Sequence, residues 1–164
     1  MIERRTDHVT RKRVADMSPE EMRRALLVSE KTGLPNKRAF DETEASPFVA
    51  MIDVNGLKAL NDEFGYSAGD MLIQRVAEVL IGAGLNAYHD KGDEFLCTGK
   101  SHRELRRKLA HAQTLLGAQR LPIEGLDGRV KVMASAGFCY GIGPNIREAE
   151  RSLKHQKELR KVTR

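Results

Sequence analysis

Residues 88–95 read Tyr-His-Asp-Lys-Gly-Asp-Glu-Phe, and the rest of the chain is organised around this stretch. Strand-like apolar runs at 87–89 and 95–97 overlap the two ends of this stretch. The Asp-Lys-Gly at 90–92 between them is typical of a hairpin turn. The predicted tip therefore carries Asp93 and Glu94 beside a flexible glycine. Such a tip suits a divalent metal and a phosphate. A charged turn without any function has the same composition, because turns favour these residues.

A second stretch, Phe-Val-Ala-Met-Ile-Asp at 48–53, is an apolar run that ends in a carboxylate. This pattern predicts a buried strand whose last residue, Asp53, emerges at the edge of a sheet. Residues 53–70 then follow the spacing D-x-x-x-x-K-x-x-N-x-x-x-G-x-x-x-G-D. Together with Gly-Asp-Glu-Phe at 92–95 and Thr-Gly-Leu-Pro-Asn-Lys-Arg at 32–38, this spacing resembles the GGDEF domain of diguanylate cyclases. The resemblance covers roughly residues 29–161.

The remaining patterns predict an α+β fold. Ser18 and Glu21 form a capping-box pattern with proline between them, which marks the start of a helix. We expect further helices at 36–45, 56–63, 67–81, 102–116 and 145–161, and apolar periodicity supports those at 67–81 and 102–116. We expect residues 129–140 to form a central strand whose start pairs with residues 120–124. Helices on a mostly antiparallel sheet follow from this order, in agreement with the palm-like nucleotidyl-cyclase fold that the resemblance implies.

Length and composition predict one domain. The chain has 164 residues, 40% of them apolar, which can bury a real core. We expect residues 1–30 to form a basic N-terminal arm and leading helix, and residues 31–164 to form the GGDEF domain. No membrane-spanning run, signal peptide or metal-binding cysteine spacing occurs, so a cytoplasmic protein with reduced Cys97 and Cys139 is expected. The net charge of +5 suits a polyanionic ligand, and it equally suits simple solubility.

The predicted site begins with the acids. Because adjacent strands lie about 5 Å apart, Asp53 and Asp93 can share a metal. By resemblance, these two acids and the carbonyl of Val54 are ligands of two Mg²⁺ (or Mn²⁺) ions. Glu94 would assist the metals or take the proton from an attacking 3′-hydroxyl. Lys58 falls at a helix start beside the nucleotide, where the resemblance makes it part of the catalytic machinery.

The resemblance also implies a GTP site. Asn61 and Asp70 match guanine-reading positions, and the chemistry agrees, because a carboxylate can accept from guanine N1–H and its amino group. Each could equally be a helix-capping residue. Gly92 would let the nucleotide approach closely. Lys157 and Lys161 match basic positions that hold the β- and γ-phosphates, although Lys161 replaces an arginine and offers no bidentate fork; a solvated basic face is the alternative.

Several positions depart from the family pattern. Lys91 replaces the first glycine of the signature, where it could attract phosphate or crowd the site. Ser29 and Lys31 replace the usual Asp and Leu before the turn at 32–36. The positions of the inhibitory R-x-x-D product site hold Gly82 and Leu85, so we expect that site to be absent.

Three hypotheses follow. The first is a diguanylate cyclase that condenses two GTP into cyclic di-GMP and two pyrophosphates, and it needs a homodimer, stable or transient. The second is a catalytically inactive nucleotide-binding regulatory module. The third is a nucleic-acid-binding module that uses the basic ends of the chain. We favour the first, because none of the departures removes a metal carboxylate. We therefore expect neither nucleic acid nor a membrane as a partner, and we interpret His89, His102 and His155 as ordinary residues.

Overall fold

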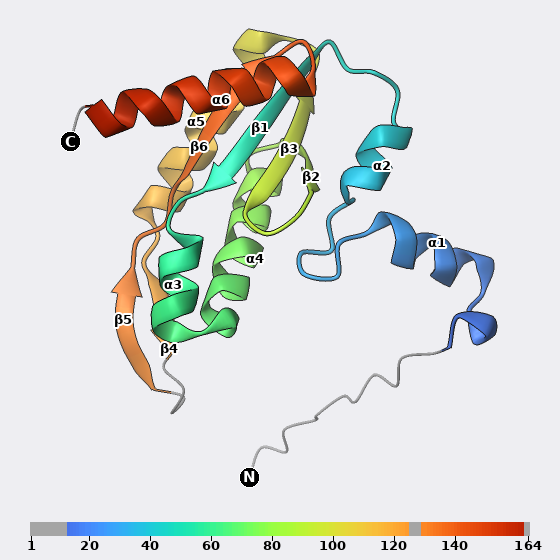
Figure 1. Cartoon of the computed structure of the whole chain (residues 1–164), viewed down its shortest axis with the longest axis horizontal. Coiled ribbons are helices and arrows are strands. Elements are labelled where there is room, and N and C mark those ends of the chain that lie inside the picture. Colours follow the sequence, from blue (N-terminus) through green and yellow to red (C-terminus); the bar gives the residue numbers. More distant parts are fainter. Residues whose placement is uncertain (1–12, 125–128, 163–164) are drawn as a thin grey trace.

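The computed structural model describes residues 13–124 and 129–162, so residues 1–12 of the predicted N-terminal arm lie outside the described residues. Figure 1 shows the course of the chain through a central sheet and the helices around it. In chain order the elements are a 3₁₀ turn at Val14–Asp16, α1 Pro19–Leu27, α2 Lys37–Glu42, β1 Phe48–Val54, α3 Leu57–Phe64, α4 Tyr66–Gly82, β2 Asn86–His89, β3 Glu94–Gly99, α5 His102–Ala118, β4 Leu121–Glu124, β5 Val130–Ala134, β6 Phe138–Gly143 and α6 Ile146–Val162.

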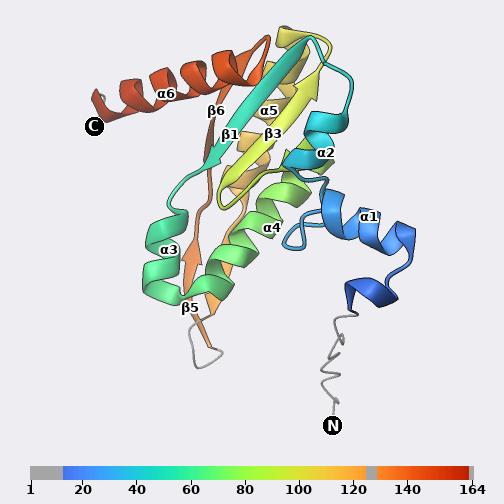
Figure 2. The ribbon, with the colours of Figure 1, turned by 45° about the vertical axis from the view of Figure 1, so that its right-hand side comes forward.

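The main sheet has the order β2-β3-β1-β6, and every neighbouring pair is antiparallel. Alternate residues of β1 face opposite sides, as the period of a strand requires. Ala50 and Ile52 belong to the large core beneath α4 and α5, whereas Val49 packs with Tyr88 and Leu96 on the other side. Figures 1 and 2 show α6 on this second side of the sheet. The predicted α+β class with a mostly antiparallel sheet is confirmed.

The prediction of a central strand at 129–140 is wrong. Residues 130–134 form β5, which pairs only with β4 in a separate two-stranded sheet among the described residues. After β5 the chain returns to the main sheet with β6, which is an edge strand of that sheet and pairs with β1. The central strands are β1 and β3. Alternation of apolar residues identifies a strand but carries no information about its neighbours, and this explains the error. The predicted pairing of 120–124 with the start of this segment is confirmed.

Two glycines of β6 bring α6 unusually close to the sheet. A Cβ added to Gly141 would lie 2.1 Å from the backbone nitrogen of Leu153, and one added to Gly143 would lie 2.6 Å from the nitrogen of Ala149. Real side-chain carbons do not approach backbone atoms that closely. The absence of a side chain at Gly141 and Gly143 therefore sets the distance between this part of α6 and the sheet.

The helix signals in the sequence are mostly confirmed. Ser18 accepts from the backbone of Glu21, whose side chain accepts from the backbone of Ser18, so α1 begins with the predicted capping box. The predicted apolar face of α5 is buried at Leu105, Leu109, Ala112 and Leu116. Cys97 and Cys139 are buried free thiols, as expected. Over the described residues, no helix combines the length and the apolar character needed to cross a lipid bilayer.

Candidate active site at the β1–β3 edge

The signature hairpin places two carboxylates at one end of the sheet. The β1–β3 register sets Asp53 opposite Glu94, and the backbone N–H of Val54 donates to the carbonyl of Asp93 at 2.9 Å. A tight turn closes the hairpin, in which the N–H of Glu94 donates to the carbonyl of Lys91 at 2.9 Å. Backbone pairing therefore brings Asp53 and the turn residue Asp93 to the same end of the sheet, one register position apart.

Gly92 occupies the position of this turn that needs a glycine. Its φ is +54°, a backbone conformation that side chains rarely adopt. Among the described residues, every residue with a positive φ is a glycine, so Lys91 adopts the turn without left-handed strain. Lys91 is exposed, and it is absent from the lining of the cavity beside the hairpin. The signature thus keeps the glycine that its geometry requires.

A cavity of about 580 Å³ lies beside this hairpin. Its walls come from the end of β1, the start of α3 and the last turns of α6. It brings together six of the residues predicted from sequence, namely Asp53, Val54, Lys58, Asp93, Lys157 and Lys161. Acidic groups therefore face basic groups across one space. This is the arrangement needed to hold a cation together with the phosphates of a nucleotide.

The neighbouring acids give this end of the sheet the negative charge that a cation needs. Burial is the main cause that raises the pKa of Glu94 above its ordinary value; the nearby acids, including Asp93 and Asp53, act in the same direction, whereas Lys91 opposes them. Lys157 Nζ lies 2.7 Å from Asp53 Oδ2 and supplies part of the missing positive charge. Carboxylate and carbonyl oxygens are the ligands that Mg²⁺ prefers. The donor set therefore fits the expected ions, which would have to displace Lys157 from Asp53.

Four predicted residues lie outside the lining of this cavity: Glu94, Asn61, Asp70 and Gly92. Within the described part of the chain, no group of three or more His, Cys, Asp or Glu side chains is arranged to hold a metal ion. The structure thus brings Asp53 and Asp93 together at the cavity but does not add Glu94 to them as a third acid.

Asn61 and Asp70 lie instead at the contact between α3 and α4. A Cβ added to Gly69 would lie 1.9 Å from Asn61 Oδ1, so the amide rests directly against the backbone next to Asp70. Asn61 Oδ1 is buried, and no hydrogen-bond donor reaches it. A buried acceptor without a partner costs free energy, and a ligand that donates a hydrogen bond to it would remove this cost. The Asp70 carboxylate forms an ion pair with Lys31, at 2.6 Å between Oδ1 and Nζ.

Sequence reasoning missed the neighbours of the cations on α6. Arg160 lines the cavity, and its guanidinium donates to the Cys139 sulfur at 3.1 Å. The Cys139 thiol in turn donates to Asn55 Oδ1 at 3.3 Å. The helical spacing of 157, 160 and 161 could have revealed Arg160, because residues three and four apart share a helix face. Lys161 stands where the family pattern has an arginine, and in this chain Arg160 supplies a guanidinium one residue earlier.

His89 makes packing and hydrogen-bond contacts with two segments next to the site. It is buried and lies against the Phe95 ring, with 4.8 Å between the ring centroids. Its Nε2 lies 3.1 Å from the Gly92 carbonyl and its Nδ1 lies 2.7 Å from Ser29 Oγ. The carbonyl can only accept, so Nε2 carries the proton and the Ser29 hydroxyl donates to Nδ1. His89 therefore links the 29–36 turn to the signature hairpin.

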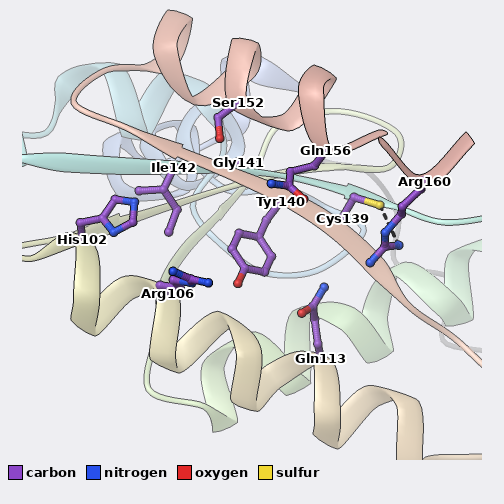
Figure 3. Close-up of a pocket in the computed structure, with 10 residues that line it drawn as sticks. All are labelled: His102, Arg106, Gln113, Cys139, Tyr140, Gly141, Ile142, Ser152, Gln156 and Arg160. Atoms are coloured by element: carbon purple, nitrogen blue, oxygen red, sulfur yellow. Dashed lines mark hydrogen bonds between the residues drawn. The ribbon is translucent and has the colours of Figure 1, made fainter. Parts of the chain in front are cut away.

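A second cavity, of about 330 Å³, lies between α5 and α6 along β6 (Figure 3). Arg106 and Gln113 approach it from α5, and Gln156 and Arg160 approach it from α6. Its lining contains no carboxylate. It shares Cys139 and Arg160 with the first cavity, but it lacks the carboxylates that Asp53 and Asp93 supply there. The end of β1 and β3 beside the hairpin is therefore the candidate active site.

The profile of the family described as "Diguanylate cyclase, GGDEF domain" matches residues 28–161. The chain belongs to the GGDEF family. The diguanylate cyclase VdcA of Vibrio cholerae is 34% identical over 85 residues, which are 46% of this chain and 25% of that protein. The diguanylate cyclase DgcP of Escherichia coli is 35% identical over 79 residues, which are 40% of this chain and 23% of that protein. The chain thus spans about a quarter of the length of these curated relatives.

Solved structures share the GGDEF fold. The coiled coil and GGDEF domain of DgcB from Caulobacter crescentus, determined in complex with c-di-GMP, has a TM-score of 0.66 and 21% identity over 83% of this chain and 78% of that one. At this identity the likeness shows the fold alone. The recognition of a GGDEF domain from the spacing at 53–70 and 92–95 is confirmed by the family match.

Proposed function

We propose that this GGDEF domain is a diguanylate cyclase that condenses two molecules of GTP into cyclic di-GMP. One observation carries the proposal: Asp53 and Asp93 line one cavity at the paired ends of β1 and β3, and the other walls of this cavity supply Lys58, Lys157 and Lys161. In each of two condensations, a 3′-hydroxyl oxygen bonds to the α-phosphorus of the other GTP. The bond from that phosphorus to pyrophosphate breaks, and the hydroxyl loses its proton.

The side chains divide this work by charge. Asp53, Asp93 and the Val54 carbonyl would hold one or two divalent ions, which neutralise developing phosphate charge when bound. Lys58, Lys157 and Lys161 would bind the phosphate oxygens. Glu94, which the β1–β3 register sets opposite Asp53, would take the proton of the attacking hydroxyl or assist the metal ions.

The base would bind at the α3–α4 contact. The Asp70 carboxylate would accept from guanine N1–H and the 2-amino group, and the Asn61 amide lies against the backbone next to it. Adenine lacks this pair of donors, so it would form neither bond with Asp70. One domain holds one GTP in this arrangement. The reaction therefore needs two copies that face each other, as a lasting or a transient homodimer.

A second candidate is a nucleotide-binding regulator without turnover. The ion pair between Lys157 and Asp53 favours it, because an ammonium already occupies an oxygen that a metal would need. Lys91 favours it less, because it is exposed and lies outside the cavity lining. Both candidates predict GTP binding, and only the first predicts a product.

The test is incubation of the full chain with GTP and MgCl₂, with the products identified by mass spectrometry. We expect cyclic di-GMP and pyrophosphate, with product formation reduced at least ~100-fold in Asp93→Ala. Asp41→Ala, which removes an exposed acid of α2, is the matched control and should keep full activity. Binding of GTP without any product would favour the regulator instead. No binding and no product would refute both candidates.

A further inference from the structure

Lys31 is the direct partner of the carboxylate at the proposed guanine site. Its ammonium nitrogen lies 2.6 Å from Asp70 Oδ1. The two residues come from separate segments, because Lys31 stands in the turn between α1 and α2 whereas Asp70 lies in the second turn of α4. The side chains are 40% and 46% exposed, so a ligand can reach both. An exposed pair of this kind contributes little to folding and can readily open to admit a third group.

The backbone of Lys31 is anchored where it can serve this site. Its carbonyl accepts a hydrogen bond of 3.2 Å from the Gln74 amide, which lies one helical turn after Asp70 on α4. The turn is closed by two bonds of 2.8 Å, from the N–H of Gly33 to Ser29 and from the N–H of Ser29 to Leu34. Gly33 has a φ of +73°, which favours glycine. The Lys31 side chain therefore starts from a fixed point and runs along α4 to the carboxylate.

The edge of guanine has a third group that Asp70 cannot serve. A carboxylate accepts from N1–H and the 2-amino group, but O6 is itself an acceptor and needs a donor. A lysine ammonium has three donors and no acceptor, and only one of the three is used on Asp70. Since O6 neighbours N1 on the ring, an ammonium bonded to the oxygen that receives N1–H stands beside O6. Adenine presents an amino group at that place, which would face the ammonium donor to donor.

We propose that Lys31 reads the O6 atom of guanine, and that Lys31 and Asp70 together form the specificity element for the base. This inference rests on the proposed GTP site at Asn61 and Asp70. It assigns a role to a residue that departs from the family pattern, in which an apolar leucine is usual. The competing interpretation is that Lys31 obstructs Asp70 and weakens nucleotide binding.

The test measures binding of GTP and of 6-thio-GTP, in which a weakly accepting sulfur replaces O6, by calorimetry with MgCl₂ on the full chain. In Lys31→Met we expect GTP affinity to fall about five- to tenfold, which is within the range for a typical net hydrogen bond. Affinity for 6-thio-GTP should change less than about twofold, while Lys31→Arg keeps the preference for GTP. Lys108→Met is the matched control, because it removes another exposed ion pair, with Glu104, and should change neither affinity.

Three outcomes would overturn the inference: a rise in GTP affinity in Lys31→Met, which makes Lys31 an obstruction; no change, which makes it a bystander; or an equal fall for both nucleotides, which makes it a general attraction for phosphate. Asp70→Asn separates these from failure of the proposed function. If the wild-type chain binds GTP and Asp70→Asn weakens binding, the base site stands and only the role of Lys31 is in question. If the wild-type chain binds no GTP, the proposed function itself fails.

Discussion

Replacing Gly69 with alanine tests how the base-reading end of the site is built. Gly69 is buried in α4, where its missing side chain makes room for Asn61. The new Cβ would lie 1.9 Å from Asn61 Oδ1, 2.8 Å from its Cγ and 2.9 Å from Leu57 Cδ1. Ordinary van der Waals contact begins at 3.4 Å, so the amide would have to move by about 1.5 Å. Asn61 must therefore leave its place between α3 and α4.

The expected cost follows from two opposing effects. Overpacking of a well-packed contact costs about 1–3 kcal/mol, whereas alanine in a helix interior is favoured over glycine by about 1 kcal/mol. We therefore expect Gly69→Ala to destabilise the domain by about 1 kcal/mol, which lowers the melting temperature by roughly 2–4 °C for a chain of this size. GTP affinity should fall to the level of Asn61→Ala, because the same amide is lost from the site.

The test measures thermal unfolding and GTP binding of four variants, namely Gly69→Ala, Asn61→Ala, the double variant Asn61→Ala/Gly69→Ala and Gly117→Ala. Gly117→Ala in α5 is the matched control, since a Cβ there meets nothing within 4 Å and should stabilise the domain. The double variant Asn61→Ala/Gly69→Ala removes the clashing amide and should recover at least about 1 kcal/mol relative to Gly69→Ala. If Gly69→Ala is as stable as Gly117→Ala, or if the double variant recovers nothing, the contact between Asn61 and residue 69 is not what the structure shows.

Gly141→Ala in β6 would push α6 away from the sheet, so we expect the free energy of unfolding, measured by chemical denaturation, to fall by about 3 kcal/mol or more. A fall of less than about 1 kcal/mol would show that α6 can shift freely. Burial is the main cause that lowers the pKa of His89, so the folded state disfavours its charged form, and stability should fall as the pH drops below its ordinary value of 6.5. His89→Gln should flatten this dependence in melting curves taken across pH 5–8, whereas the exposed His155→Gln should not; equal slopes would contradict the assignment. Arg160→Ala should weaken GTP binding at least as much as Lys161→Ala, because only arginine offers a planar fork to phosphate, and calorimetry that finds Arg160 neutral would exclude it from the site.

The sequence predicts the elements of this fold well and their arrangement less well. Apolar periodicity in 67–81 and 102–116 locates α4 and α5, because one face of each helix must be buried. The same reasoning fails for β5 and β6. A strand pattern at 130–136 cannot reveal that the chain pairs first with β4 and reaches the main sheet only at Phe138. Partner choice depends on contacts between distant segments, and periodicity does not report these.

The site divides in the same way. The neighbourhood of Asp53 and Asp93 was predictable, because Asp53 lies next to the end of one strand, Asp93 lies in the turn that leads into the next, and the two strands pair. The ion pair of Lys31 with Asp70 was not predictable, nor was the bond of His89 to Ser29, because each joins side chains from segments far apart in the chain. A single sequence carries no signal for such pairs, since either partner alone is an ordinary surface or core residue.

The two halves of the candidate site are therefore fixed by different forces. The carboxylates are held by backbone hydrogen bonds of β1 and β3, which persist whatever side chains surround them. Lys157 is held by the docking of α6, and that docking depends on Gly141 and Gly143. A change in β6 that moves α6 should then weaken the grip on phosphate while the acids stay in place. Cation binding and the α6 contribution to phosphate binding should accordingly be separable by mutation, because the paired strands carry one and the docked helix carries the other.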